Sequence, residues 1–371
     1  MHLIYGIFYK PKCSEAPLIK RILVVTMTDF HLPIIDLSKS KTHRDELSKQ
    51  LVNALETVGF LYIDNVEGAD FEKMFQCSKW FFDQPIEIKG KVMRNYWNPE
   101  NTNLYRGYFP VVEDYPNHNE CFEFGRDISA IDEDNNPENW FYERTPWPKE
   151  DAKFPFKDIF QNQYEAAHTA AMEILRLVAR GVGLAEETFV EMFTDKPCST
   201  FRITHYPPWN GTPSPNAIIT DDGKCVTLSQ HTDTNFLTLI CTFAYQGLEI
   251  LGADGSWNPV APRKNSFVMN IGDLFAKMTN GRFKATIHRV LDIGVDRYSS
   301  GFFLEPSYES DVGINLLSRT EDSKHIPEKY GPYMINATKY VKQNYLEYEG
   351  LPDFENVRET YYGKNKEDLL N

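Results

Sequence analysis

The sequence lacks the features that identify several classes of protein. Its six cysteines are scattered over 371 residues with no CxxC pair, which is typical of free thiols in a reducing compartment and not of a disulfide framework or a zinc ribbon. No apolar run approaches the ~20 residues that a membrane-crossing helix needs. Internal repeats and low-complexity stretches are also absent. We therefore expect a globular protein of the cytoplasm with no membrane partner.

Basic charge is scarce as well. The chain has 53 acidic and 39 basic residues, which gives a formal net charge of -14. A surface of this sign repels phosphate backbones, so the composition argues against a nucleic-acid partner. It does not exclude a small anionic substrate, because one buried arginine can set the local field. We expect a monomer that acts on a small molecule.

Residues 1–26 do not resemble a secretory signal. Their apolar stretch, Ile22 to Val25, is too short, and a small-residue cleavage site is missing. We interpret residues 1–26 as a disordered or artefactual extension before Met27. A weak organellar presequence is the alternative, because this segment contains basic residues.

Hydrophobic periodicity predicts four helices. Apolar residues recur every three or four positions after Thr42 up to Gly59, and again over residues 70–82. The clearest pattern is a continuous apolar stripe over residues 157–181, which predicts one long helix that braces the rest of the fold. Residues 327–349 look helical again. Between residues 94 and 155 the period is lost, and an aromatic-rich loop is expected there.

Short β-rich runs broken by Gly, Pro, Asn and Asp dominate the second half of the chain. They cover residues 200–206, 225–228, 237–243, 248–251, 266–271, 285–291 and 298–304, and residues 32–37 and 60–63 form two earlier runs. Strands at such spacing favour a sandwich or jelly roll. The fold class predicted is therefore α+β, with helices flanking the β core.

Two histidines and one aspartate form a candidate metal site. His231 and Asp233 are two residues apart, so a strand end would present both side chains to one point. His288 lies in a later β-rich run. Two imidazoles and one carboxylate form the facial triad of non-haem Fe(II) sites, which leaves three coordination positions open. Zinc hydrolases also use two histidines and a carboxylate, and His-x-Asp alone occurs by chance in many chains.

A possible anion site follows the second histidine. Arg297-Tyr298-Ser299 begins nine residues after His288, and strand alternation places Arg297 and Ser299 on one face. A guanidinium grips a carboxylate with two parallel hydrogen bonds, and the neighbouring hydroxyl adds a donor. A dicarboxylate that chelates the metal at one end would be held there at the other. An ordinary surface ion pair is the alternative for Arg297.

Several motifs, taken together, resemble the 2-oxoglutarate/Fe(II)-dependent dioxygenases, in the branch that contains isopenicillin N synthase. The similarity extends over roughly residues 30–345. The matching segments are residues 202–208 (RITHYPP), His231-Thr232-Asp233, His288-Arg289-Val290, Arg297-Tyr298-Ser299 and, in the first half, residues 32–37, 59–63, 106–108 and 120–125.

This resemblance implies a double-stranded β-helix (jelly-roll) core. It implies iron ligands His231, Asp233 and His288, and cosubstrate contacts from Arg297, Ser299 and Tyr206. Many plant members have asparagine two residues before the tyrosine, whereas this chain has Thr204. We interpret the adjacent His205 as a variable position and not as a ligand.

The resemblance also implies the reaction. With Fe(II), O2 and 2-oxoglutarate, and with ascorbate in support, the protein would hydroxylate or desaturate a small molecule and release succinate and CO2. No catalytic residue beyond the metal ligands is expected. The aromatic segment 94–126 and residues 303–308 are candidate pocket walls. Three alternatives remain at this stage: an iron oxidase of the isopenicillin N synthase or aminocyclopropane-carboxylate oxidase type, a zinc hydrolase, and a non-catalytic jelly-roll module.

The same reasoning predicts a division of the chain into five parts. They are the extension 1–26, an N-terminal dioxygenase region 27–155, the bracing helix and its connection 156–196, the jelly-roll core 197–310, and a helical tail 311–371.

Overall fold

The computed structural model describes residues 30–112, 115–126, 140–151, 153–209, 213–313, 317 and 327–341. All of its helices and strands lie in one unit, His31–Asn371. The expectation for residues 1–26 falls outside the described residues, as does the end of the predicted C-terminal helix. The five-part division of the chain stays a prediction.

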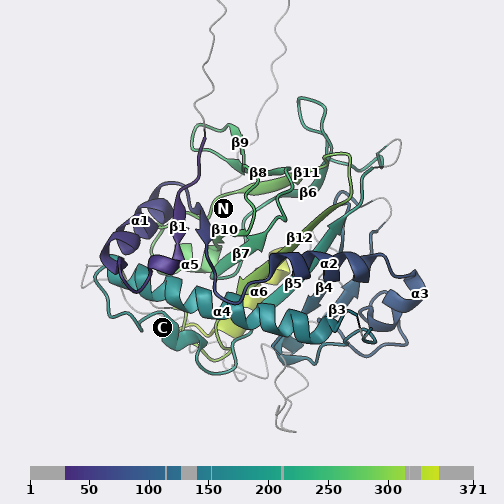
Figure 1. The fold of residues 1–371 in the computed structure, drawn as a ribbon, viewed down its shortest axis with the longest axis horizontal. Coiled ribbons are helices and arrows are strands. Elements are labelled where there is room, and N and C mark those ends of the chain that lie inside the picture. Colours follow the sequence, from purple (N-terminus) through teal and green to yellow (C-terminus); the bar gives the residue numbers. More distant parts are fainter. Residues whose placement is uncertain are drawn as a thin grey trace, which may run out of the picture. The chain divides into compact units, whose positions relative to one another are not determined.

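Two β-sheets form the core (Figure 1). The larger sheet has eight strands in the order β1 (Ile34–Asp36), β2 (Phe60–Asp64), β10 (Ser266–Ile271), β7 (Leu237–Cys241), β12 (Arg297–Leu304), β5 (Thr200–Tyr206), β4 (Glu120–Phe124) and β3 (Gly107–Phe109). The smaller sheet has four, in the order β6 (Val226–His231), β11 (His288–Leu291), β8 (Leu248–Leu251) and β9 (Trp257–Pro259). The jelly-roll core predicted from the sequence is confirmed.

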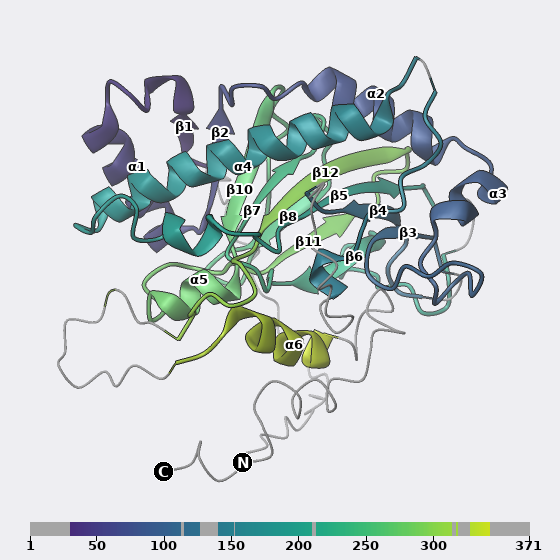
Figure 2. The ribbon, with the colours of Figure 1, turned by 90° about the horizontal axis from the view of Figure 1, so that it is seen from below.

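Helices flank this core, and two of them cover the outer face of the larger sheet. The α-helices are α1 (Arg44–Thr57), α2 (Phe71–Phe82), α3 (Ile86–Lys89), α4 (Phe156–Gly181), α5 (Asp273–Met278) and α6 (Tyr330–Val341). Short 3-10 turns add η1 (Leu37–Lys39), η2 (Gly90–Val92), η3 (Trp140–Tyr142) and η4 (Val190–Phe193). Figure 2 shows α2 and α4 along one side of the larger sheet and α6 on the other. No helix among the described residues is long and apolar enough to span a membrane.

The long bracing helix predicted at residues 157–181 is confirmed as α4. Its apolar stripe, which includes Phe160, Tyr164 and Ile174, is fully buried. Pro155 stands immediately before the helix, where its missing N–H costs nothing. The helix therefore forms because the 3.6-residue apolar period matches a continuous buried surface.

Strand β5 shows how the sequence separates core from cavity. Phe201 and Ile203 are fully buried on the helix-covered side, where the Phe201 ring contacts Phe160 of α4. The alternate residues, from Thr200 to Tyr206, line a cavity on the other side. Strand alternation thus places the polar side chains of β5 on the side of the sheet that faces the cavity.

The structure corrects several sequence expectations. Strands β3 and β4 lie within the expected loop 94–155, and every residue of β4 is buried, so the alternation that identifies a half-exposed strand is missing. Strand β7 ends at Cys241, and the left-handed φ of Phe243 and Ala244 explains the stop. The short elements β9 and α5 were not predicted, since three and six residues are too few to show a period.

Gly59 connects α1 to β2 and positions the site described below. Its φ is +73°, and an added Cβ would lie 2.0 Å from the carbonyl oxygen of Lys284. The next residue, Phe60, packs its ring edge-on against His288 at 5.4 Å. The close approach thus fixes the spacing between β2 and the chain leading into β11.

We expect Gly59→Ala to lower the free energy of unfolding by roughly 2–4 kcal/mol, because it combines left-handed strain with a backbone clash. Gly183→Ala is the matched control: its φ is +82° but nothing lies within 4 Å of the added Cβ, so the cost should be about 1–2 kcal/mol. Urea denaturation measures both. Equal losses in the two variants would show that the Lys284 contact has no role.

Candidate active site

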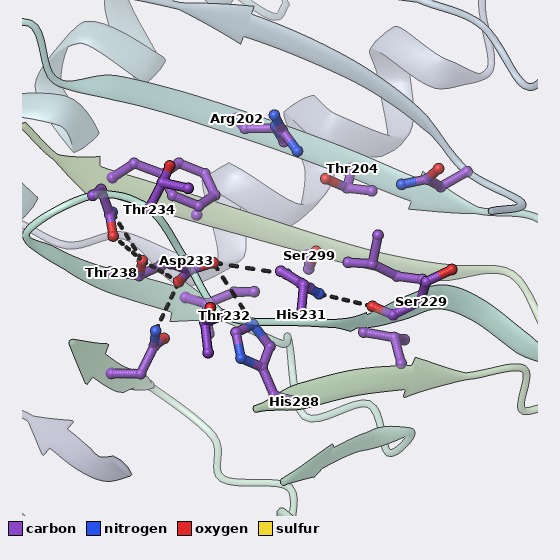
Figure 3. A pocket seen from close by; sticks show the side chains of 18 of the residues that line it. Arg202, Thr204, Ser229, His231, Thr232, Asp233, Thr234, Thr238, His288 and Ser299 are labelled. Atoms are coloured by element: carbon purple, nitrogen blue, oxygen red, sulfur yellow. Dashed lines mark hydrogen bonds and ion pairs between the residues drawn. The ribbon is translucent and has the colours of Figure 1, made fainter. Parts of the chain in front are cut away.

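The three predicted metal ligands come together where β6 ends and β11 begins. His231 and His288 are direct partners in the antiparallel pairing, and their ring centroids are 4.2 Å apart. Asp233 follows two residues after His231, and its Oδ1 lies 3.7 Å from the Nε2 atom of each histidine. Figure 3 shows the three side chains pointing toward one another. One potential ligand atom from each residue lies within 4.8 Å of the others.

Both imidazoles are oriented by backbone carbonyls. His231 Nδ1 lies 2.7 Å from the oxygen of Ser229, and His288 Nδ1 lies 3.2 Å from the oxygen of Thr286. A proton on each Nδ1 leaves both Nε2 lone pairs facing Asp233, the arrangement that second-sphere hydrogen bonds give to metal-binding histidines. Burial and the nearby His288 also lower the pKa of His231, which favours its neutral form.

The two carboxylate oxygens of Asp233 have different surroundings. Its Oδ2 accepts hydrogen bonds from Thr238 Oγ1 at 2.5 Å and from Asn270 Nδ2 at 2.7 Å. Burial acts to raise the pKa of Asp233, but the two histidines and these two donors lower it overall. The carboxylate form is therefore favoured, and Oδ1 faces the histidines.

Sequence reasoning missed Thr238 and Asn270. Asn270 carried a detectable signal, since it is a lone amide in the otherwise mostly apolar run SFVMNI of β10. An amide at such a position needs a buried partner. Nothing in the sequence showed that this partner is Asp233.

The donor set fits a divalent metal ion. Two imidazole nitrogens and one carboxylate oxygen converge, and all three residues line a cavity of about 670 Å³. This is the donor set of a 2-His-1-carboxylate site, and a metal ion held by these three residues would lie at the cavity wall.

Arg297 is buried and lacks a full set of partners. Its side chain is 2% exposed, and its Nε donates to the carbonyl oxygen of Gln246 at 3.0 Å. Its Nη1 is buried with no hydrogen-bond partner among the described residues. Burial lowers the pKa of Arg297, but arginine stays charged in proteins. The surface ion pair considered as an alternative is therefore not what the structure contains.

The other two expected cosubstrate residues lie beside Arg297. Tyr206 pairs with Arg297 across β5 and β12, and the guanidinium carbon lies 4.6 Å from the centre of the tyrosine ring. Ser299 pairs with Thr204 in the same ladder. Tyr206, Ser299 and Thr204 line the cavity, whereas Arg297 lies behind that wall. The buried Nη1 of Arg297 has no partner among the described residues, and an anionic group of a ligand could accept its hydrogen bond.

His205 faces away from the triad, as a variable position would. Its Nδ1 lies 2.8 Å from Glu120 Oε1, and its Nε2 lies 3.1 Å from Asp296 Oδ1. Its ring stacks on Tyr298 at 4.7 Å. It is therefore part of a structural cluster on the outer side of β5.

We expect Thr238→Val to weaken Co(II) affinity about 10- to 100-fold, because the substitution keeps the shape but removes one donor that orients Asp233. The control is Thr242→Val, since Thr242 is also buried but makes none of the hydrogen bonds to the triad. Calorimetric Co(II) titration measures both. If Thr238→Val left the Co(II) affinity unchanged, the Oδ2 hydrogen bonds would not matter to the site.

Two family models match the chain. The model of the 2OG-Fe(II) oxygenase superfamily matches residues 197–306, which include all three triad residues. The model described as the non-haem dioxygenase in morphine synthesis N-terminal region matches residues 32–150. Together they span both the jelly-roll residues and the preceding half of the chain.

Curated proteins and solved structures agree with these matches. Azadirone synthase LFS of Melia azedarach is 30% identical over 327 residues, which is 83% of this chain and 92% of the relative. Gibberellin 2-beta-dioxygenase 4 of Arabidopsis thaliana is 29% identical and covers 78% of this chain and 84% of its own length. The crystal structure of a full-length Neurospora crassa protein in complex with alpha-KG superposes with a TM-score of 0.68 at 25% identity, over 83% of this chain and 96% of that protein.

Alpha-KG is 2-oxoglutarate, so one structural neighbour holds the cosubstrate that the sequence predicted. The resemblance inferred from the motifs is confirmed by all three comparisons. The chain is a member of the 2OG-Fe(II) oxygenase superfamily, and thus an oxidoreductase.

Proposed function

We propose that this chain uses Fe(II), O2 and 2-oxoglutarate to hydroxylate or desaturate a small-molecule substrate, with release of succinate and CO2. The observation that carries this proposal is the convergence of two imidazole Nε2 atoms and one carboxylate oxygen on a cavity inside a jelly roll. Family membership supports it independently.

His231, Asp233 and His288 are the proposed iron ligands. The iron would supply the redox chemistry by which O2 and 2-oxoglutarate oxidise a C–H bond. The protein's part is geometric: the β6–β11 pairing sets the distance between the imidazoles, and Thr238 and Asn270 hold the carboxylate. No residue beyond the ligands is assigned a proton-transfer role.

Arg297, Ser299 and Tyr206 are the proposed cosubstrate residues. The buried Nη1 of Arg297 would donate to the distal carboxylate of 2-oxoglutarate, which satisfies a donor that has no other partner among the described residues. Ser299 would add a hydroxyl on the same strand face, and Tyr206 would pack between the guanidinium and the cavity.

The alternative of an iron oxidase that does not use 2-oxoglutarate is not favoured. One curated relative reported above is named as a dioxygenase, and the Neurospora crassa structure contains alpha-KG. A zinc hydrolase and a non-catalytic jelly roll lose support for the same reason, since both family matches are to oxygenases.

We propose that the substrate is a small organic molecule. The names of two relatives refer to gibberellin and azadirone, and both are small organic molecules. The assignments to the isopenicillin N synthase-like branch, to the cytoplasm and to a monomer without nucleic-acid or membrane partners stay predictions, as does the supporting role of ascorbate.

Purified protein with Fe(II) and ascorbate is expected to convert 2-oxoglutarate to succinate, slowly even without its substrate. The reason is that the proposed iron and 2-oxoglutarate sites consist of protein side chains alone and need no group from the substrate. Succinate and 2-oxoglutarate can be quantified by chromatography. Protein that binds iron but never consumes 2-oxoglutarate, even with a wide metabolite panel, would favour the oxidase alternative.

Arg297→Leu is expected to raise the KM for 2-oxoglutarate about 100-fold while iron binding persists, since a charge-assisted bond worth roughly 3 kcal/mol is lost. Arg263→Leu is the control, because Arg263 pairs with Asp64 and contacts the Tyr62 ring, both on β2, whereas Arg297 lies on β12 beside Tyr206. An unchanged KM in Arg297→Leu would remove Arg297 from the cosubstrate site.

A further inference from the structure

The cavity extends beyond the triad, away from the proposed cosubstrate residues. Along β5 the cavity-facing residues run from Tyr206 through Thr204 and Arg202 to Thr200, and Tyr206 pairs with Arg297 at one end. At the other end Thr200 pairs with Phe303. Phe303 in turn pairs with Thr238, the residue that holds Asp233. The Thr200 end of the row therefore lies on the Asp233 side of the triad, away from Arg297, and remains for a substrate.

That far end is polar. Its lining includes Tyr105, Glu123, Thr200, Arg202, Phe303 and Glu305. Two of these six residues are acids and one is an arginine, in a wall where hydrocarbon side chains would suffice to hold an apolar molecule. Polar side chains in such a wall fix the orientation of a ligand and determine which ligand is accepted.

Arg202 is held in a fixed orientation at the cavity wall. Its Nε donates to Glu123 Oε1 at 2.6 Å, and its Nη2 forms an ion pair with the same carboxylate. Its guanidinium carbon lies 5.5 Å from the ring centre of Phe109 and 5.4 Å from that of Phe303. An arginine with its plane set by a carboxylate and two rings is pre-organised for binding oxygen acceptors.

Arg202 is the more exposed member of this pair, and it lines the cavity. The Arg202 side chain is 19% exposed, whereas that of Glu123 is 3% exposed. Glu123 also pairs with the buried Arg94, so its carboxylate is engaged on both sides. Figure 3 shows Arg202 on the strand across the cavity from His231 and His288. A molecule at the far end would thus meet the guanidinium edge before it met the carboxylate.

Glu305 provides a second polar contact at the same end. It is 3% exposed, and its Oε2 accepts a hydrogen bond from Thr200 Oγ1 at 3.3 Å. Thr200 in turn accepts from Arg106 Nη1 at 2.7 Å. Burial raises the pKa of Glu305 to about 7, so near neutral pH its carboxyl group can donate as well as accept a hydrogen bond.

We propose that Arg202 and Glu305 form the substrate-recognition site, and that they select a small molecule whose polar edge presents a carboxylate or amide-carbonyl oxygen to Arg202. This inference rests on the proposed function, because it assigns to the substrate the part of the cavity that iron and 2-oxoglutarate would not fill. An apolar substrate of the same size would remove water from both polar groups and offer neither of them a hydrogen bond in return, and a site built for hydrogen bonding rejects such analogues strongly.

The test begins with three sets of small metabolites: carboxylates, amides without a carboxylate, and compounds with neither group. Each compound is added to the wild-type enzyme with Fe(II) and 2-oxoglutarate, and succinate formation above the compound-free rate is measured. We expect the strongest stimulation from one of the first two sets, and which set it is tells whether the acceptor is charged. Strongest stimulation from the third set, or none from the first two, would overturn the proposal.

The second step uses the best compound with variants of Arg202. Arg202→Gln is expected to raise the KM for that compound about 100-fold. Arg202→Lys keeps the charge next to Glu123 but loses the planar guanidinium, so its KM should lie between those of the wild type and Arg202→Gln. Arg263→Gln is the control, since Arg263 pairs with Asp64 and lies 5.7 Å from the Tyr62 ring but outside the cavity lining. A KM within threefold of wild type in both Arg202 variants would contradict the assignment.

Glu305 is tested with two substitutions. Glu305→Ala should raise the same KM more than tenfold, whereas Glu305→Gln keeps a hydrogen-bonding group and should stay closer to wild type. Equal effects of the two changes would remove Glu305 from the recognition site.

Two kinds of failure are distinguishable in these experiments. Wild-type protein that binds no iron or never consumes 2-oxoglutarate contradicts the proposed function itself. If the wild-type protein consumes 2-oxoglutarate but the Arg202 variants respond to the compounds as the wild type does, only this inference is contradicted. Melting temperature and Co(II) affinity of each variant show whether a rise in KM comes from lost recognition or from a disturbed fold.

Discussion

The antiparallel pairing of His231 with His288 is the constraint on which the rest of the site depends. It brings two imidazoles from residues 57 positions apart to a centroid distance of 4.2 Å. Backbone carbonyls orient both rings, and two hydrogen bonds commit one oxygen of Asp233 to the protein. What remains is a set of three lone-pair donors that meet at the cavity wall, and a cation bound there would stabilise this arrangement.

The smaller sheet carries the two histidines of this site, and the larger sheet forms the facing wall with Arg297 and Arg202 on β12 and β5. On its outer face α2 and α4 bury the apolar residues of β5 and β12, and on its inner face the alternate residues line the cavity. Arg297 at one end is buried and Arg202 toward the other is partly exposed, and their partners differ as well. Glu123 neutralises Arg202, whereas Arg297 has a donor without a partner among the described residues. This difference is why we assign a dicarboxylate cosubstrate to Arg297 and a substrate acceptor group to Arg202.

The sequence predicted those features that follow from local periodicity and spacing. The 3.6-residue apolar stripe predicted α4, and alternation placed His231 with Asp233 and Arg297 with Ser299. Features that depend on tertiary contacts were missed. Strand β4 is buried on both faces and shows no alternation, and Thr238 and Asn270 gain their roles only when β7 and β10 approach Asp233. Likewise, segment 94–126 was correctly suspected as a pocket wall, since it supplies Tyr105 and Glu123, but the partnership of Glu123 with Arg202 required the β4–β5 register.

The triad and Arg297 together are proposed to make one site for a metal-chelated dicarboxylate. The most direct measurement is a calorimetric titration of 2-oxoglutarate, without oxygen, into the protein with and without Fe(II). We predict that 2-oxoglutarate binds at least tenfold more tightly to the iron-loaded protein, because chelation adds to the Arg297 contact. Equal affinity in the presence and absence of iron would contradict this proposal.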